Sequence, residues 1–128
     1  MTSDNILKTK VGSIDVVLLS DRGELSIKHK KELYRYRQLT PQENLLMSTL
    51  MPALGHFASY EFLYDVMTDK QQKKPILDQK FYDRVYNLVN YLKRKLAGTK
   101  LGLKNRRQFG IELIDKTKDS KRYGPHLD

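Results

Sequence analysis

The sequence predicts a mixed α+β domain in which antiparallel strands come first, three helices follow, and a β-hairpin closes the fold. Three observations support this order. Strand-forming residues dominate positions 14–19 and a turn follows at 20–23. Helix-capping residues then precede three stretches with apolar residues at helical spacing. Finally, residues 100–107 and 109–115 can pair as a hairpin, with Leu103, Ile111 and Leu113 supplying strand character.

Two or three short antiparallel strands are expected at the start of the domain. Residues 14–19 (Ile-Asp-Val-Val-Leu-Leu) are rich in strand formers, and Gly23 suits a positive φ in the turn that follows. Polar and apolar residues alternate in 24–28 and again around Tyr34. These strands therefore precede the helices.

Capping residues mark the first two helices. Residues 40–43 (Thr-Pro-Gln-Glu) form a capping box with proline at the first helical position. Pro52 and Gly55 should end this helix. Its expected core positions are Leu46, Met47, Leu50 and Met51. Ser59 suits the N-cap of a second, short helix. The residues expected to share one face of that helix are Phe62, Leu63, Val66 and Met67.

The third helix has the clearest periodicity in the chain. Asp78 can cap it and Gly98 can close it. Between them, six apolar residues recur at nearly ideal spacing for a period of 3.6, namely Phe81, Val85, Leu88, Val89, Leu92 and Leu96. Tyr82 and Tyr86 flank this stripe, and we expect both to pack.

Composition is typical of a soluble globular protein, with 39% hydrophobic and 30% charged residues. The 128 residues suit one domain. We expect an N-terminal arm at 1–12, the domain at 13–115 and a polar C-terminal tail at 116–128. Since cysteine is absent, disulfides and thiolate metal sites are excluded. The sequence has no signal peptide and no apolar run of membrane-spanning length, so a cytoplasmic location is expected.

The net charge of +9 is concentrated in one part of the sequence. Residues 69–107 contain twelve basic and three acidic side chains, whereas the rest of the chain carries twelve of each sign. A cationic segment on a neutral body indicates a polyanionic partner held on one side. Nucleic acid is the first candidate, and an anionic membrane surface is the second.

The polar side of the third helix is the candidate base-reading surface. Lysine, arginine and asparagine can offer paired donors and acceptors to base edges, and an α-helix fits the major groove. The candidates there are Lys80, Arg84, Asn87, Asn90, Tyr91 and Arg94. The alternative is an ordinary solvated helix face, but such a face usually mixes both signs of charge.

Further contacts with nucleic acid are expected outside this helix. A basic cluster near the hairpin tip can reach the minor groove or phosphates, and it consists of Lys104, Asn105, Arg106 and Arg107. The alternative for this cluster is a mobile charged turn. Expected phosphate contacts are Thr40, Ser59, Tyr60 and Lys93.

With these elements in this order, the chain resembles the winged-helix effector domain of OmpR/PhoB-type response regulators. Residues 39–43 are similar to that family's "LT-x-x-E" helix start, and 59–63 to its "S-x-x-x-L" second helix. Residues 92–96 resemble its "LR-x-KL" ending of the recognition helix, and 105–113 its "T-V-R-G-x-G-Y-x-L" wing. The resemblance covers residues 14 to 113.

The resemblance implies a winged helix-turn-helix with a four-stranded N-terminal sheet, a three-helix core and a wing. It implies a sequence-specific transcriptional regulator that binds double-stranded DNA. It also implies a linker at 68–77 that can touch RNA polymerase, and a homodimer of two protomers on a direct repeat.

Several positions depart from the family pattern. Arg107 falls on the wing arginine, but Lys93 replaces an arginine and loses its bidentate fork. Gln108 and Ile111 replace a glycine and a tyrosine of the wing. The residues ahead of the first expected strand are too few for a receiver domain, so we expect no phosphorelay control. Regulation would then come from expression level, a partner or dimerisation.

Two other function classes remain at this point. The same fold can serve as a protein-interaction or assembly module of a larger complex, because fold does not fix function. An enzyme has little support, since His29, His56 and His126 lack metal-ligand spacing. Glu61 and Asp65 are expected on an exposed helix face. We therefore expect no catalytic residues, no metal and no cofactor.

Overall fold

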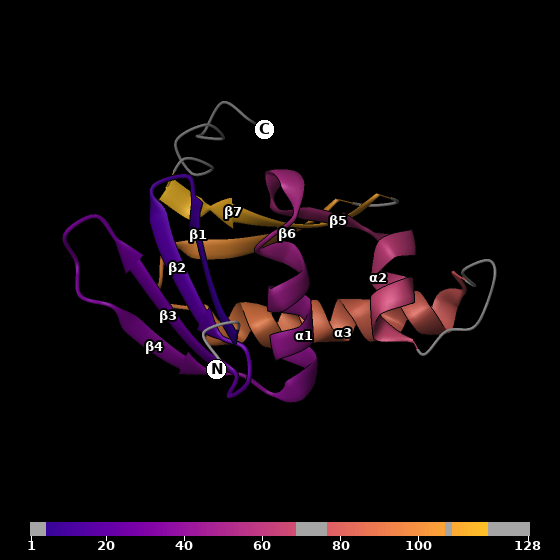
Figure 1. The fold of residues 1–128 in the computed structure, drawn as a ribbon. Helices are drawn as coiled ribbons and strands as arrows, with labels where there is room; N and C mark the ends of the chain where they lie inside the picture. The colour runs from indigo at the N-terminus through magenta and orange to yellow at the C-terminus, as the bar shows by residue number, and fades with distance from the viewer. Residues whose placement is uncertain (1–4, 69–76, 107–108, 118–128) are drawn as a thin grey trace, which may run out of the picture.

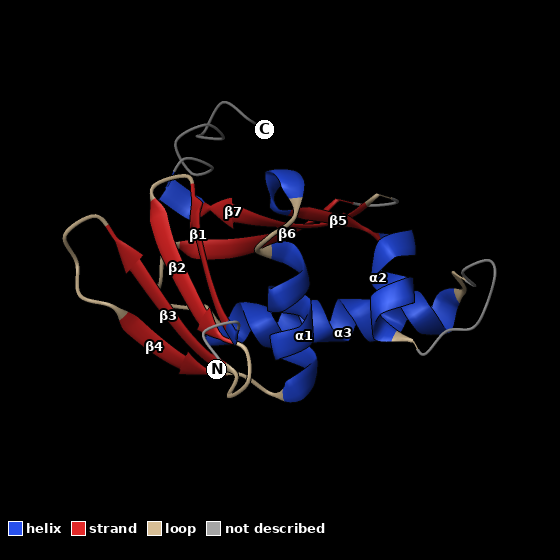
Figure 2. Cartoon of the chain, viewed as in Figure 1, coloured by secondary structure: helices blue, strands red, loops and turns tan. Residues whose placement is uncertain are grey.

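The computed structural model describes residues 5–68, 77–106 and 109–117. These residues form an α+β fold with two antiparallel sheets and three α-helices (Figure 1). The elements in chain order are β1 (Ile6–Val11), β2 (Ile14–Leu19), β3 (Glu24–His29), β4 (Arg35–Gln38), α1 (Pro41–Leu50), the 3-10 turn η2 (Leu54–His56), β5 (Phe57–Ser59), α2 (Tyr60–Met67), α3 (Gln79–Lys95), β6 (Leu101–Arg106) and β7 (Gly110–Asp115). In Figure 2 the three-stranded sheet lies above the helices, and the four-stranded sheet lies to their left.

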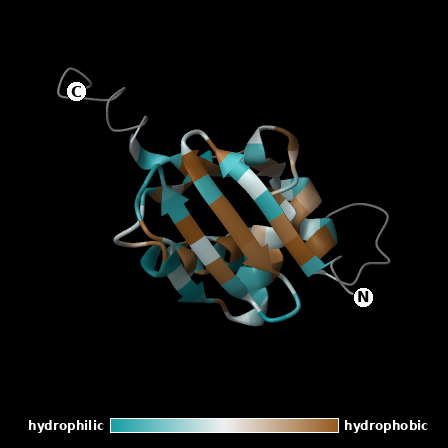
Figure 3. Ribbon diagram, turned by 60° about the vertical axis from the view of Figure 1, so that its left-hand side comes forward, coloured by the Kyte–Doolittle hydropathy of each residue, from teal (hydrophilic) through white to brown (hydrophobic). Residues whose placement is uncertain are grey.

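The first sheet has the order β1-β2-β3-β4, with every neighbouring pair antiparallel. Its inner side supplies buried core residues, namely Ile14, Val16, Leu18, Leu25 and Ile27. Buried and half-buried residues alternate along β2 and through most of β3, as expected when one side of a sheet is buried, and Figure 3 shows the hydrophobic bands of these strands. Residues 6–11, expected in an N-terminal arm, instead form β1, because they pair with β2 along its whole length.

Both expected helix starts are confirmed in α1 and α2. Thr40 and Glu43 form the complete capping box, in which each side chain accepts the other residue's amide. Ser59 accepts the amide of Phe62 at 3.1 Å. The expected face of α2 is confirmed at Leu63 and Met67 but wrong at Phe62, which is 51% exposed. The buried side consists of Tyr60, Leu63, Tyr64 and Met67, which also follow the helical period and pack against the core.

The second sheet joins the terminal hairpin to the helices. β6 and β7 form the expected hairpin, and β5 adds a third strand in the order β5-β7-β6. β5 was not expected from the sequence, and it directly precedes α2. Its Ala58 pairs with Ile111 so closely that a Cβ on Gly110 would lie 2.0 Å from the Ala58 carbonyl oxygen. The hairpin is therefore fixed to the start of α2.

Side chains at the C-terminal end of α3 hold this helix against the first sheet and α1. Arg37 of β4 donates from Nε to the Lys95 carbonyl at 2.6 Å and from Nη2 to the Ala97 carbonyl at 3.0 Å. Lys95 donates from Nζ to the Gln38 carbonyl at 2.6 Å and to Glu43 Oε1 at 2.8 Å. Cations near the last carbonyls are favourable at this end of a helix.

Asp115, at the end of β7, ties the hairpin to the β1–β2 turn. Its Oδ2 accepts the amide and the hydroxyl of Ser13, each at 2.7 Å. Its Oδ1 accepts the amide of Thr117 at 2.9 Å and the Thr117 hydroxyl at 2.5 Å. The neighbouring Gly12 has φ 62°, and a Cβ there would lie 2.5 Å from Asp115 Oδ2. The close approach of turn and carboxylate therefore requires glycine.

The environment of Asp115 favours its ionised form. Burial alone would raise the pKa of this carboxyl, but the hydrogen bonds from Thr117 and Ser13 outweigh it and hold the pKa well below its usual range. A lowered pKa stabilises the fold at every pH above the unfolded-state value of about 4. This stabilisation is lost as the pH falls from there toward the folded-state pKa.

We expect Asp115→Asn to lower the free energy of unfolding by about 1–3 kcal/mol at neutral pH, because an amide cannot accept all four bonds. The difference from the native chain should shrink as the pH falls below about 4. Denaturant unfolding across a pH series measures both effects. Asp21→Asn, in the exposed β2–β3 turn, is the matched control and should change little. An unchanged stability of Asp115→Asn would contradict this assignment.

Candidate nucleic-acid interface

Helix α3 buries one side and exposes the other. The N-cap is confirmed, since Asp78 accepts the amide of Phe81 at 3.0 Å. The expected apolar stripe is also buried, namely Phe81, Val85, Leu88, Val89, Leu92 and Leu96. Tyr82 packs against Tyr60, with their ring centroids 5.0 Å apart. Tyr86 was expected to pack but is 57% exposed, because it lies on the outward side of the helix.

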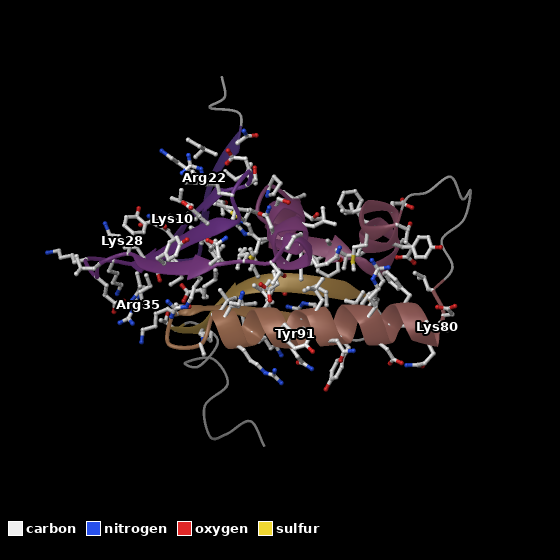
Figure 4. All side chains as sticks on the ribbon, turned by 90° about the horizontal axis from the view of Figure 1, so that it is seen from below. Lys10, Arg22, Lys28, Arg35, Lys80 and Tyr91 are labelled. Carbon is white, nitrogen blue, oxygen red and sulfur yellow. The ribbon has the colours of Figure 1, made fainter. Side chains whose placement is uncertain are left out.

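The candidate base-reading residues gather on the outward side of α3. Lys80, Arg84, Asn87, Tyr91 and Arg94 are exposed, and Asn90 is half-buried. Figure 4 shows Lys80 near one end of α3 and Tyr91 near its middle, with side chains directed away from the body of the molecule. The helix thus presents cationic and amide groups to solvent over most of its length.

Two of these cations have contacts within the molecule. The Arg94 guanidinium lies 5.4 Å from the centroid of the Tyr91 ring, which is cation–π distance. Arg84 donates from Nη2 to the Met67 carbonyl, a long bond of 3.4 Å at the end of α2. A guanidinium has five N–H donors, so this bond leaves Arg84 able to bind a further acceptor.

A groove runs beside these residues, between α3 and the first helix. It has a volume of about 680 Å³ and an apolar floor that includes Met67 and Leu88. Its other lining residues are Thr40, Gln42, Glu43, Arg84, Asn87, Tyr91 and Lys95. The structure therefore brings Thr40, an expected phosphate contact, close to three of the expected base-reading residues.

Lys95 and Glu43 form a partly buried ion pair at the edge of this groove. Their Nζ to Oε1 distance is 2.8 Å, and the Glu43 side chain is only 4% exposed. Burial would raise the Glu43 pKa, but the bonds from Lys95 and the Thr40 amide outweigh it and lower that pKa. Glu43 is therefore charged at neutral pH and holds Lys95 in place.

The hairpin residues differ in how far their side chains are available. Arg106 donates from Nε to Glu112 Oε1 at 2.6 Å, so a carboxylate already neutralises its charge. Asn105 is exposed and accepts a hydrogen bond from the Tyr60 hydroxyl. Lys104 faces Glu112 in the strand register. Arg107, the expected wing arginine, lies outside the described residues, as does Gln108.

Tyr60 is a correction to the expected phosphate contacts. Its side chain is 5% exposed, its hydroxyl is bonded to Asn105, and its amide donates to the Phe109 carbonyl at 3.1 Å. Burial of the ring raises the pKa of its hydroxyl. Ser59 is half-buried as the N-cap of α2, whereas Thr40 and Lys93 are exposed. Tyr60 thus braces the hairpin and does not face solvent.

Sequence reasoning missed the side chains that hold α3 in place. Arg37 and Lys95 were counted only as charges, although both bond to backbone carbonyls next to the helix end. A basic last turn is a known signal for a helix C-terminus, and it could have identified Lys95. Nothing local could have identified the role of Arg37, whose partners at the end of α3 are more than fifty residues away. The expected linker at 68–77 lies almost wholly outside the described residues.

Within residues 5–68, 77–106 and 109–117, no group of three or more His, Asp or Glu side chains is placed to hold a metal ion. A hydrogen bond of 2.9 Å joins His56 Nε2 to Thr9 Oγ1. None of the described helices has the length and apolar character needed to span a bilayer. No family model matches this chain, and no curated protein matches it in sequence.

Proposed function

We propose that this protein is a cytoplasmic regulator of transcription that binds double-stranded DNA in a sequence-specific way. In this proposal the fold is a winged helix-turn-helix, with α2 and α3 as its helix pair and the β6–β7 hairpin as its wing. α3 lies in the major groove, and the hairpin lies over the adjacent minor groove or phosphates. The observation that carries the proposal is the outward side of α3, where exposed Lys80, Arg84 and Asn87 stand opposite a fully buried stripe.

The support for this arrangement is geometric. A helix can read base edges only if one side is free along its length and the other is fixed to a rigid body. α3 meets both requirements, because its C-terminal end is held by Arg37 and by the Glu43–Lys95 pair. The hairpin is fixed to the same body through β5.

The exposed residues divide into two roles under this proposal. Arg84, Asn87 and Asn90 carry donors and acceptors suited to base edges, with Lys80, Tyr91 and Arg94 beside them. Lys93 and Thr40 contact phosphates, together with Ser59 at the start of α2. The hairpin residues that reach the duplex are Lys104, Asn105, Arg106 and Arg107. Glu112 faces Lys104 and pairs with Arg106, so the duplex shares these cations with that carboxylate. RNA polymerase contacts through 68–77 and a homodimer on direct repeats remain part of the proposal.

A protein-interaction or assembly module is the second candidate. The groove favours it, since Met67 and Leu88 form an apolar floor that a partner's side chains could fill. The two candidates differ at Arg84, Asn87 and Tyr91. If the protein is a DNA-binding regulator, these side chains bind DNA. If it is an interaction module, they bind a protein, and removing them does not change its weak affinity for DNA.

We expect Arg84→Ala and Asn87→Ala each to weaken binding to a selected duplex site by about 1–3 kcal/mol and to relax base preference locally. The site is first obtained by selection from a random duplex pool, and affinity is then measured in competition with random DNA. Arg22→Ala, an exposed arginine in the β2–β3 turn, serves as the control. Failure to enrich any site, or equal affinity for site and random duplex, would contradict sequence-specific binding.

A phosphate contact should give a different signature. The logarithm of the binding constant should fall with the logarithm of salt concentration with a slope of about −4 to −7 for a handful of contacts. Lys93→Gln should make this slope shallower by about 1 and weaken all sequences alike. Lys100→Gln, an exposed lysine beyond α3, is the matched control. An identical slope for the native chain and Lys93→Gln would remove Lys93 from the interface.

A further inference from the structure

The outer side of the four-stranded sheet is a surface with no role in the proposed duplex site. Strand pairing places Lys8, Val17, Ser26 and Tyr36 in one row across the four strands. Paired residues project to the same side of a sheet, opposite to their sequence neighbours. This row therefore faces away from the buried Ile27 and Leu18. No described helix covers this side of the sheet in Figure 3.

A second row on the same side of the sheet, across β1, β2 and β3, consists of charged residues. Lys10 pairs with Asp15, and Asp15 pairs with Lys28. The Lys10 ammonium lies 3.5 Å from the Asp15 carboxylate, and the Lys28 ammonium lies 5.4 Å from the centroid of the Tyr34 ring. We call Lys8, Lys10, Lys28, Tyr34 and Tyr36 the outer sheet face.

The two tyrosines of this face expose more than half of their surface. Tyr34 and Tyr36 are each 52% exposed, and they are two residues apart at the free edge of the sheet. The Tyr36 hydroxyl donates to Gln38 Oε1 at 2.7 Å, which fixes the ring along the strand. Both rings thus offer aromatic surface to solvent beside lysine ammonium groups.

The charge of this part of the molecule is positive. Residues 5–38 contain eight lysines and arginines against four acidic residues. A count of all residues outside 69–107 hides this excess, because the acidic residues of α1, α2 and the hairpin cancel it. In the folded chain the labelled Lys10, Lys28 and Arg35 lie around the sheet, at the opposite end of the molecule from Lys80 (Figure 4).

We propose that the outer sheet face binds single-stranded nucleic acid. Bases stack on Tyr34 and Tyr36, and the backbone phosphates lie against Lys8, Lys10 and Lys28. An antiparallel sheet with exposed aromatic rings and flanking cations is a general platform for unpaired bases. The ammonium of Lys28, already held over the Tyr34 ring, marks where a phosphate is neutralised beside a stacked base.

The aromatic rings favour unpaired bases over the two other polyanions that the lysines alone would attract. A duplex keeps its bases stacked on each other, so it would use the cations and leave both tyrosines without a role. An acidic peptide would likewise need the cations and not two flat rings. Each alternative therefore predicts that removal of the tyrosines has little effect.

The test uses fluorescence anisotropy of a labelled thymidine oligonucleotide with the full chain. Tyr34→Ala and Tyr36→Ala should each weaken binding at least about fivefold, since stacking on one ring contributes on that scale. Tyr34→Phe and Tyr36→Phe keep the ring and should retain the native affinity. Tyr86→Ala is the matched control, because Tyr86 is 57% exposed on α3, outside this face.

Two further variants test the lysines of this face and its independence from the duplex site. Lys8→Gln/Lys10→Gln should weaken oligonucleotide binding and make its salt dependence shallower. Arg84→Ala should leave oligonucleotide binding unchanged, whatever its effect on duplex affinity. The proposal is overturned if the alanine variants bind like the native chain, if polyglutamate competes as well as the oligonucleotide, or if Arg84→Ala abolishes the binding.

Discussion

The position of α3 depends on the ion pair between Glu43 and Lys95. Glu43 closes the capping box of α1, so the same carboxylate fixes the start of one helix and the end of another. Lys95 also reaches the Gln38 carbonyl, and Arg37 from the same strand reaches the carbonyls at the end of α3. First sheet, α1 and α3 therefore meet at one set of charge-assisted bonds, and removal of Lys95 would leave the buried Glu43 carboxylate without its ionic partner. Together with the buried stripe, this junction fixes which side of α3 faces outward.

The elements predicted from the sequence are those with local signals. Thr40, Ser59 and Asp78 cap their helices as expected because a cap involves only neighbours within three residues. β1 and β5 were missed because a strand is defined by a partner far along the chain, and β5 has only three residues. The buried side of α2 was predicted only in part, at Leu63 and Met67, because two overlapping residue sets share the helical period. Contacts of Tyr60 and Tyr64 with Tyr82 and Phe81 decide between them.

The placement of the candidate site on α3 was predictable from the sequence, but the side-chain partners of the hairpin residues were not. The spacing of the apolar stripe identifies Arg84 and Asn87 as outward residues, because the stripe occupies the buried side of the helix. It cannot show that Glu112 neutralises Arg106 across two strands, or that Tyr60 of α2 is buried against Asn105 of β6. A count along the sequence also conceals the basic first sheet, whose excess charge is cancelled by residues that lie elsewhere in space.

The attachment of the hairpin through β5 has a consequence for any duplex that the molecule engages. Gly110 lies so close to Ala58 that β7 and the start of α2 are joined without room for a side chain between them. The protein therefore sets the spacing between α3 and the hairpin. Under the proposed function the adjustment falls to the DNA, so the bendability and groove width of the base pairs between the two contacts would help to select a site even where no side chain touches them.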